Sequence, residues 1–171
     1  TVYSYDANGN LASKTDALGN VTQYEYDANG NLLTIIFADR TSVSYTYDAL
    51  GRQTSATDPL GNVTRYKYDA LGNVLEITLP DQTTQTATYT HNSQLATVKD
   101  ALRNQAKYTY DGNGNCLTET DALGHTTISE YDAAGHLISE TNAAGGVTTY
   151  RYDAQGFPIS VTDAAGATQT Y

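Results

Sequence analysis

Tyr-Asp recurs every 21 residues along this chain, and no other feature constrains its fold as strongly. The pair stands at Tyr5-Asp6, Tyr26-Asp27, Tyr47-Asp48, Tyr68-Asp69, Tyr110-Asp111, Tyr131-Asp132 and Tyr152-Asp153, with Tyr89-Thr90 in the one gap. Eight such units fill all but three of the 171 residues without an insertion. A period of 20 to 50 residues is typical of a repeat array, in which each unit buries surface only against its neighbours. We therefore expect a single array over residues 1–171 and a function carried by a periodic surface.

Two turn signals divide each unit. The first follows Tyr-Asp and places glycine at Gly9, Gly30, Gly51, Gly72, Gly114, Gly135 and Gly156, and the second reads Thr-Asp-x-x-Gly, as at 15–19, 57–61 and 120–124. Asp accepts hydrogen bonds from N–H groups ahead in the chain, and Gly takes the positive φ that closes the loop. The glycine is replaced within 37–40, 79–82, 91–93 and 101–103. There we expect another residue at positive φ, or a different turn.

The runs between the turns are about six or seven residues long and rich in Thr, Val, Tyr, Ile and Leu, which is typical of strands. Strands joined by such short turns must be antiparallel, because a parallel neighbour needs a crossover of a dozen or more residues. The sequence thus predicts an all-β protein, a long antiparallel β-meander of about 17 strands. Open sheets beyond about ten strands tend to curl, so we expect a spiral or partial shell.

The strand before each Tyr-Asp alternates clearly. Pairs such as Tyr24/Tyr26 and Tyr66/Tyr68 are two residues apart and share one face, while Glu25 and Lys67 lie on the other. This predicts a half-buried strand with a tyrosine side and a wet side. The return strand has apolar residues at both alternating positions, so its core face stays open.

Composition excludes several classes of protein. The net charge of −10 argues against nucleic acid or an anionic membrane surface as a partner. No run approaches the roughly 18 apolar residues of a membrane helix, so no membrane insertion is expected. One Cys forms no internal disulfide, and Cys116 stands where other units have Leu, as a small hydrophobic residue.

Few residues are candidates for binding or catalysis. The Asp columns could bind calcium, but each turn supplies about one carboxylate, so we expect each Asp to tie its own turn. The tyrosine ladder could bind sugars, or it could simply fill the sheet face through cross-strand contacts. His125 and His136 belong to opposite hairpin ends and should not converge on a metal. No catalytic, cofactor or metal residues are predicted, and the Tyr, Asp and Gly columns named above are interpreted as structural.

The pattern Tyr-Asp-Ala-x-Gly-Asn-Leu, followed by Thr-Asp-x-x-Gly-Asn-Val-Thr-x-Tyr-x-Tyr-Asp, resembles the YD repeat of the Rhs family over the entire chain. The C and B components of bacterial Tc toxins and the teneurins share this repeat. The resemblance implies a β-sheet that spirals into a hollow shell around a toxic C-terminal polypeptide, as part of a secreted or cell-surface bacterial protein. The family's self-cleaving motif is not recognisable here, and Asp58-Pro59-Leu60-Gly61 reads as an ordinary turn.

Both ends look cut from a longer array, because Thr1–Tyr5 starts within a strand and Tyr171 stands at the repeat position of Tyr150. We therefore expect a non-catalytic shell segment whose partners are the enclosed toxin and the remainder of the shell. Its unpaired edge strands favour self-association. The alternative is a carbohydrate-binding or adhesion module that uses the tyrosine face.

Overall fold

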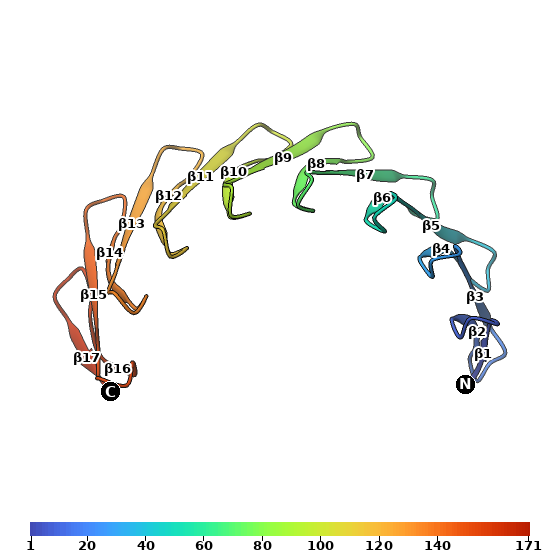
Figure 1. Cartoon of the computed structure of the whole chain (residues 1–171), viewed down its shortest axis with the longest axis horizontal. Coiled ribbons are helices and arrows are strands. Elements are labelled where there is room, and N and C mark those ends of the chain that lie inside the picture. Colours follow the sequence, from blue (N-terminus) through green and yellow to red (C-terminus); the bar gives the residue numbers. More distant parts are fainter. The chain divides into compact units, whose positions relative to one another are not determined.

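The computed structural model describes residues 1–171 and contains strands and turns but no helix (Figure 1). The strands are β1 (Val2–Tyr5), β2 (Leu11–Thr15), β3 (Val21–Tyr26), β4 (Leu32–Ile36), β5 (Ser42–Tyr47), β6 (Gln53–Thr57), β7 (Val63–Tyr68), β8 (Val74–Thr78), β9 (Thr84–Tyr89), β10 (Leu95–Lys99), β11 (Gln105–Tyr110), β12 (Cys116–Thr120), β13 (Thr126–Tyr131), β14 (Leu137–Thr141), β15 (Val147–Tyr152), β16 (Pro158–Thr162) and β17 (Thr168–Thr170). The predicted all-β fold with about 17 strands is confirmed.

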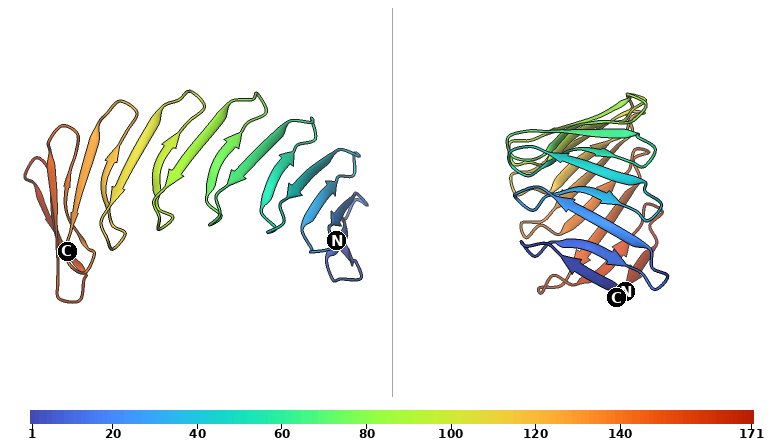
Figure 2. Two further views of the ribbon diagram at one scale, coloured as in Figure 1. Left: turned by 45° about the horizontal axis from the view of Figure 1, so that its top comes forward. Right: turned by 90° about the vertical axis from the view of Figure 1, so that its right-hand side faces the viewer.

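Successive strands pair antiparallel in chain order, as a meander requires (Figure 2). Two compact units divide the chain within β9, at Thr1–Thr86 and Ala87–Tyr171. Unit 1 contains β1 to β8 and the start of β9, which pairs with β8. Unit 2 contains the end of β9 and β10 to β17. The sheet is open, because β1 pairs with β2 and β17 pairs with β16.

All hairpin turns share one geometry. In the first, Gly9 N donates to Asp6 O at 3.1 Å and Asp6 N donates to Asn10 O at 2.8 Å. This is a three-residue loop, a type I turn followed by a residue in the left-handed region. Gly9 is that residue, with φ of 87°. Each 21-residue repeat contains two such turns, so the turns form two opposite rows. We call them the YD edge (the turns after Tyr-Asp, such as 6–10) and the far edge (such as 16–20).

The four stations without glycine keep the same turn. Arg40, Gln82, Ser93 and Arg103 adopt φ of 69°, 67°, 61° and 69°, and Arg40 N donates to Phe37 O at 2.9 Å as a glycine would. The expectation of positive φ at a substituted residue is confirmed. Neighbouring strands impose the left-handed conformation there at a cost of about 1–2 kcal/mol for a residue with a Cβ.

The two faces of unit 1 differ in chemistry. Tyr24 pairs with Ile35, Tyr45 with Ala56 and Tyr66 with Ile77 on what we call the tyrosine face. The opposite face carries hydroxyl pairs such as Ser4–Ser13, whose Oγ atoms are 2.7 Å apart, and we call it the hydroxyl face. The predicted tyrosine and wet sides of these strands are confirmed, since Tyr24 and Tyr26 are half-buried and Gln23 and Glu25 are exposed.

A register shift in each repeat determines on which face of the sheet each residue of the return strand lies. Thr46 Oγ1 lies 2.8 Å from Thr54 Oγ1 and 2.7 Å from Ser55 Oγ, so two successive residues of β6 face one residue of β5. This two-against-one arrangement is a β-bulge. It places the second residue of each return strand on the hydroxyl face. Leu75, Ile138 and Ile159 hold that position and are 37%, 37% and 42% exposed.

The fourth residue of the return strand lies on the tyrosine face, as the pairing of Ile77 with Tyr66 shows. Leu75 and Ile77 therefore point to opposite faces although they are two residues apart. Apolar residues at both alternating positions were ambiguous in the sequence because the bulge reverses the alternation within the strand.

No side chain in the chain is buried, and the sheet has no second layer. Its apolar residues are half-buried at most, held by cross-strand neighbours alone. The tyrosine face is therefore a partly dehydrated surface rather than a core.

Candidate functional site

The polar contacts that recur along this array lie in its turns. Asp27 Oδ1 accepts hydrogen bonds from the backbone N–H groups of Asn29 and Asn31, both at 2.9 Å, and Asn31 Nδ2 donates to Asp27 Oδ2 at 2.8 Å. The side-chain hydrogen bond from Asn31 holds the pKa of Asp27 below its ordinary 3.8. Both carboxylate oxygens are thus used within the turn, as the interpretation of self-tied turns expects.

The far-edge turns repeat this network. Asp58 Oδ1 accepts from Leu60 N and Asn62 N at 2.9 Å, and its Oδ2 accepts from Asn62 Nδ2 at 2.8 Å. No group of three or more His, Cys, Asp or Glu side chains is arranged to hold a metal ion. None of the elements is a helix long and apolar enough to cross a membrane.

The tyrosine of four of the Tyr-Asp pairs reaches back to the preceding repeat. Its hydroxyl donates to the carbonyl of the first return-strand residue 15 positions earlier, and these bonds are Tyr47 to Leu32 at 2.9 Å, Tyr68 to Gln53 at 2.7 Å, Tyr110 to Leu95 at 2.9 Å and Tyr152 to Leu137 at 3.0 Å. Each bond joins two adjacent antiparallel strands, at the end of the pair beyond their backbone ladder. The position therefore requires a ring with a hydroxyl, and Phe would fill the space without the bond.

The fifth residue of the YD-edge turn reaches forward to the next repeat at Arg52, Gln94 and His136, a role the sequence analysis missed. Arg52 Nε donates to Asp48 Oδ2 in its own turn, and its Nη1 donates to Asp69 O in the next, both at 2.7 Å. Its guanidinium also lies 4.9 Å from the centre of the Tyr68 ring. The signal was present as a column four positions after the first residue of the YD-edge turn, which is polar at Asn10, Asn31, Arg52, Gln94 and His136.

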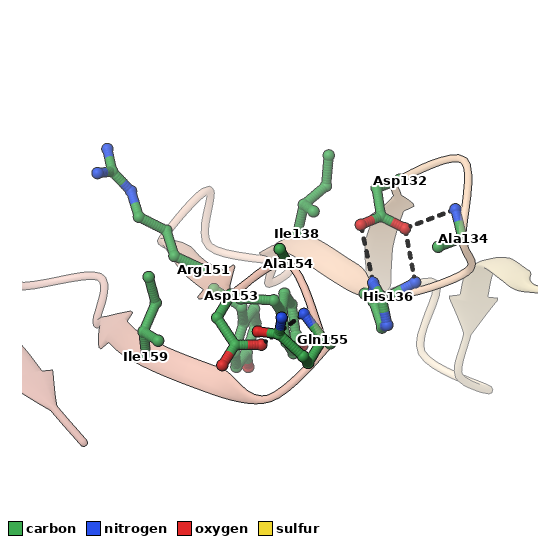
Figure 3. A pocket seen from close by; sticks show the side chains of 12 residues that line it. Asp132, Ala134, His136, Ile138, Arg151, Asp153, Ala154, Gln155 and Ile159 are labelled. Atoms are coloured by element: carbon green, nitrogen blue, oxygen red, sulfur yellow. Dashed lines mark hydrogen bonds and ion pairs between the residues drawn. The ribbon is translucent and has the colours of Figure 1, made fainter.

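His136 makes the tightest of these contacts (Figure 3). Its Nδ1 lies 2.9 Å from Asp132 Oδ2, and its ring stacks on Tyr152 with centroids 4.8 Å apart. A methyl group at Gly156 would lie 2.8 Å from His136 Nε2. The His-Asp pair resembles a catalytic dyad in distance, but its second ring nitrogen lies against Gly156 and its ring stacks on Tyr152, so the contact packs one repeat against the next.

A depression of about 590 Å³ lies beside this turn. Its lining includes Asp132, His136, Ile138, Arg151 and Ile159, and Figure 3 shows Ile138 and Ile159 pointing to the same side as Arg151. The depression is a gap between exposed side chains of an open sheet rather than an enclosed pocket. Asp153, at its rim, accepts from Gln155 N and Phe157 N at 2.9 Å.

Unit 2 places two carboxylates on its tyrosine face. Glu119 pairs with Tyr108 and Glu140 with Ser129. Burial raises the pKa of Tyr108, and the negative charge of Glu119 raises it further. Burial raises the pKa of Tyr150 in the same way, with Glu140 adding to it. In unit 1 the charged residues of β3 to β8 are Glu25, Arg65, Lys67 and Glu76, and their cross-strand partners place all four on the hydroxyl face.

The family model described as RHS Repeat matches residues 5–42, 26–63, 47–84, 89–126 and 131–168. No curated protein matches the sequence. Among solved structures, the chain is similar to TcdB2-TccC3-Cdc42, with 17% identity and a TM-score of 0.54 over 97% of this chain and 12% of that one. It is also similar to TcdB2-TccC3 without its hypervariable C-terminal region, with 17% identity and a TM-score of 0.54 over 98% of this chain and 12% of that one.

A third match, the Tc holotoxin pore of Photorhabdus luminescens, has 18% identity and a TM-score of 0.44, too low to bear on the fold. The sequence identities are low, so the first two matches establish the shared fold alone. The chain spans about an eighth of the length of these solved chains.

Proposed function

Because the chain belongs to the RHS repeat family, we propose that it is a non-catalytic structural segment of an Rhs/Tc-type β-shell that encloses a toxic C-terminal polypeptide for delivery. One observation carries the proposal: an uninterrupted antiparallel meander of in-register repeats, one sheet thick, has the fold of TcdB2-TccC3 over nearly its whole length. A wall must be continuous and thin, and this meander is both.

The contacts between repeats support the role of a wall. Backward bonds such as Tyr68 to Gln53 join adjacent strands beyond their backbone ladder, and forward bonds such as Arg52 to Asp69 join successive turns of the YD edge. Since each unit of a repeat array is stabilised by its neighbours, these links strengthen the interface on which stability depends. The carboxylates are used within their turns, which leaves no row of free ligands along the edge.

The proposed partners are the enclosed toxic polypeptide and the rest of the shell, and the proposed location is secreted or at the bacterial cell surface. The solved relatives are described as complexes of TcdB2 with TccC3, and one description names a hypervariable C-terminal region of TccC3. A segment that covers 12% of such chains would form part of the wall and leave the cargo to other regions.

The alternative of a carbohydrate-binding or adhesion module needs free tyrosine rings and hydroxyls. Tyr68 uses its hydroxyl on Gln53 O and its ring on Arg52. Tyr152 uses its hydroxyl on Leu137 O and its ring on His136. These rings are already occupied by the protein itself, and this favours the structural role.

The test is protease protection of the polypeptide downstream of the array in the full-length parent protein. We expect that polypeptide to resist digestion in the intact protein, and to become sensitive when Tyr47→Ala and Tyr68→Ala together remove two backward bonds. Leu60→Ser is the matched control, because Leu60 is 87% exposed at a turn tip and makes no such bond. Digestion of the downstream polypeptide at the same rate in the intact protein and in isolation would refute enclosure.

A further inference from the structure

The tyrosine face of unit 1 is an uncovered apolar surface. From β3 to β8 it presents tyrosines with Ile35, Val43, Ala56 and Ile77 between them and carries no charged residue. Stable domains bury such a face against a second layer. This face has none, since no side chain of the chain is buried.

The uncovered area is large enough for a stable interface. The chain exposes 11104 Å², about 2,900 Å² more than the roughly 8,200 Å² expected for a folded monomer of its mass. A standard protein interface needs about 800 Å² from each partner. This surplus belongs to the whole chain, and the tyrosine face of unit 1 needs to supply less than a third of it to match what one partner contributes.

One repeat position decides the chemistry of this face. It is the fourth residue of the return strand, opposite the first residue of each Tyr-x-Tyr, and it is occupied by Lys14, Ile35, Ala56, Ile77, Val98, Glu119, Glu140 and Val161. In unit 2 this column places Glu119 and Glu140 on the tyrosine face, so two copies of that face would repel each other. In unit 1, from β3 to β8, the column is neutral and apolar.

We propose that the tyrosine face of unit 1 docks on the same face of a second copy of this chain. A two-fold interface brings one patch against itself, so the patch must be self-complementary. The neutral part of this face, from β3 to β8, meets this requirement and the acidic face of unit 2 does not. The two sheets would pack about 10 Å apart with interdigitated tyrosine and isoleucine side chains, as in a β-sandwich. This interface goes beyond the proposed function, because it places a second copy on a face that no residue of this chain covers.

The test is sedimentation velocity on the full chain across a range of concentrations, with Ile35→Lys and Ile77→Lys as face variants. Lys14 occupies the equivalent position in the first repeat, so a lysine there is compatible with the strand. Thr34→Lys is the matched control, because Thr34 is adjacent in β4 and lies on the hydroxyl face opposite Glu25. Far-UV circular dichroism checks that each variant keeps its β-structure.

We expect the unmodified chain to form a dimer of about twice 18.4 kDa, each face variant to weaken association at least tenfold, and Thr34→Lys to leave it unchanged. A mass of 18.4 kDa at every concentration would overturn the proposal. So would association that survives both face variants, since it would place the contact at the edge strands β1 and β17. If a face variant lost its β-structure, Val98→Lys, at the same position in unit 2, would decide the matter: a dimer through unit 1 tolerates it, and one through unit 2 does not.

Discussion

The hydroxyl of Tyr68 offers the sharpest test of how the repeats hold together. It donates to Gln53 O at 2.7 Å, and the ring lies under Arg52. Tyr68→Phe removes the hydroxyl and keeps a ring of the same shape, on which a cation still stacks. The substitution therefore isolates one side-chain hydrogen bond between the adjacent strands β7 and β6.

We expect Tyr68→Phe to cost about 1 kcal/mol, because a net intramolecular hydrogen bond contributes about 0.5–1.5 kcal/mol and the half-buried carbonyl of Gln53 loses its extra donor. For a chain of this length that loss lowers Tm by about 2–4 °C. Tyr66→Phe is the control. Tyr66 lies two residues away on the same face and is also half-buried, and its hydroxyl makes no hydrogen bond within the protein.

The assay is urea unfolding at one fixed protein concentration, followed by far-UV circular dichroism and by tyrosine fluorescence. Coincident curves from the two probes justify a two-state analysis of the free energy of unfolding. Equal losses in Tyr68→Phe and Tyr66→Phe would refute the reasoning, because the hydroxyl bond to the preceding repeat would then contribute nothing of its own.

Three further predictions concern the turns. Gly156→Ala should lower the Tm more than Gly166→Ala, as measured by thermal unfolding. Both glycines have φ of 85°, but only at Gly156 would the new methyl group meet another side chain, 2.8 Å from His136 Nε2. Arg103→Gly should raise the free energy of unfolding by up to about 1 kcal/mol, because glycine adopts the φ of 69° without steric cost, and an unchanged or lower value would argue against strain at that turn. The free energy of unfolding should be constant above about pH 4 and fall below it. Hydrogen bonds from the asparagine of the same turn lower the folded-state pKa of Asp27, Asp58 and Asp69 below 3.8. The stability that these carboxylates contribute is therefore present above their unfolded-state pKa and is lost as the pH falls through their folded-state pKa. Asp27→Asn should weaken this acid dependence, because it removes one titrating carboxylate. The turn should still form, since Asn142 closes a turn of the same kind by accepting from Gly146 N at 2.9 Å.

The features predicted from the sequence are those fixed within one hairpin. An Asp at the start of a turn and a Gly three residues later determine the loop from a few adjacent residues, and the meander follows from their spacing. Even the substituted stations obeyed this rule. Arg40 and Arg103 adopt positive φ because the strands on both sides fix the loop length, and the side chain at that position must comply.

The bulge could not be predicted in the same way. Nothing in Val74-Leu75-Glu76-Ile77 distinguishes a regular strand from one in which Lys67 pairs with Glu76 and Tyr68 pairs with Val74. A strict alternation places Leu75 and Ile77 on the same face of the sheet, whereas the structure places them on opposite faces. The bulge adds one residue in each repeat, and this residue changes which side chains of the return strand share a face, which is why the sequence left that face open.

The contacts between repeats escaped the sequence analysis for a different reason. Arg52 and His136 occupy the same turn position, yet Arg52 donates to a carbonyl of the next turn while His136 stacks on the next tyrosine and closes over Gly156. Each contact depends on two successive repeats rather than on the consensus of one. The consensus residues therefore specify a backbone that any repeat can adopt. Two variable positions determine which neighbour or partner a repeat fits: the residue four positions after the start of the YD-edge turn, and the fourth residue of the return strand. If so, exchanging whole repeats should preserve the β-structure while changing stability and association according to these two columns.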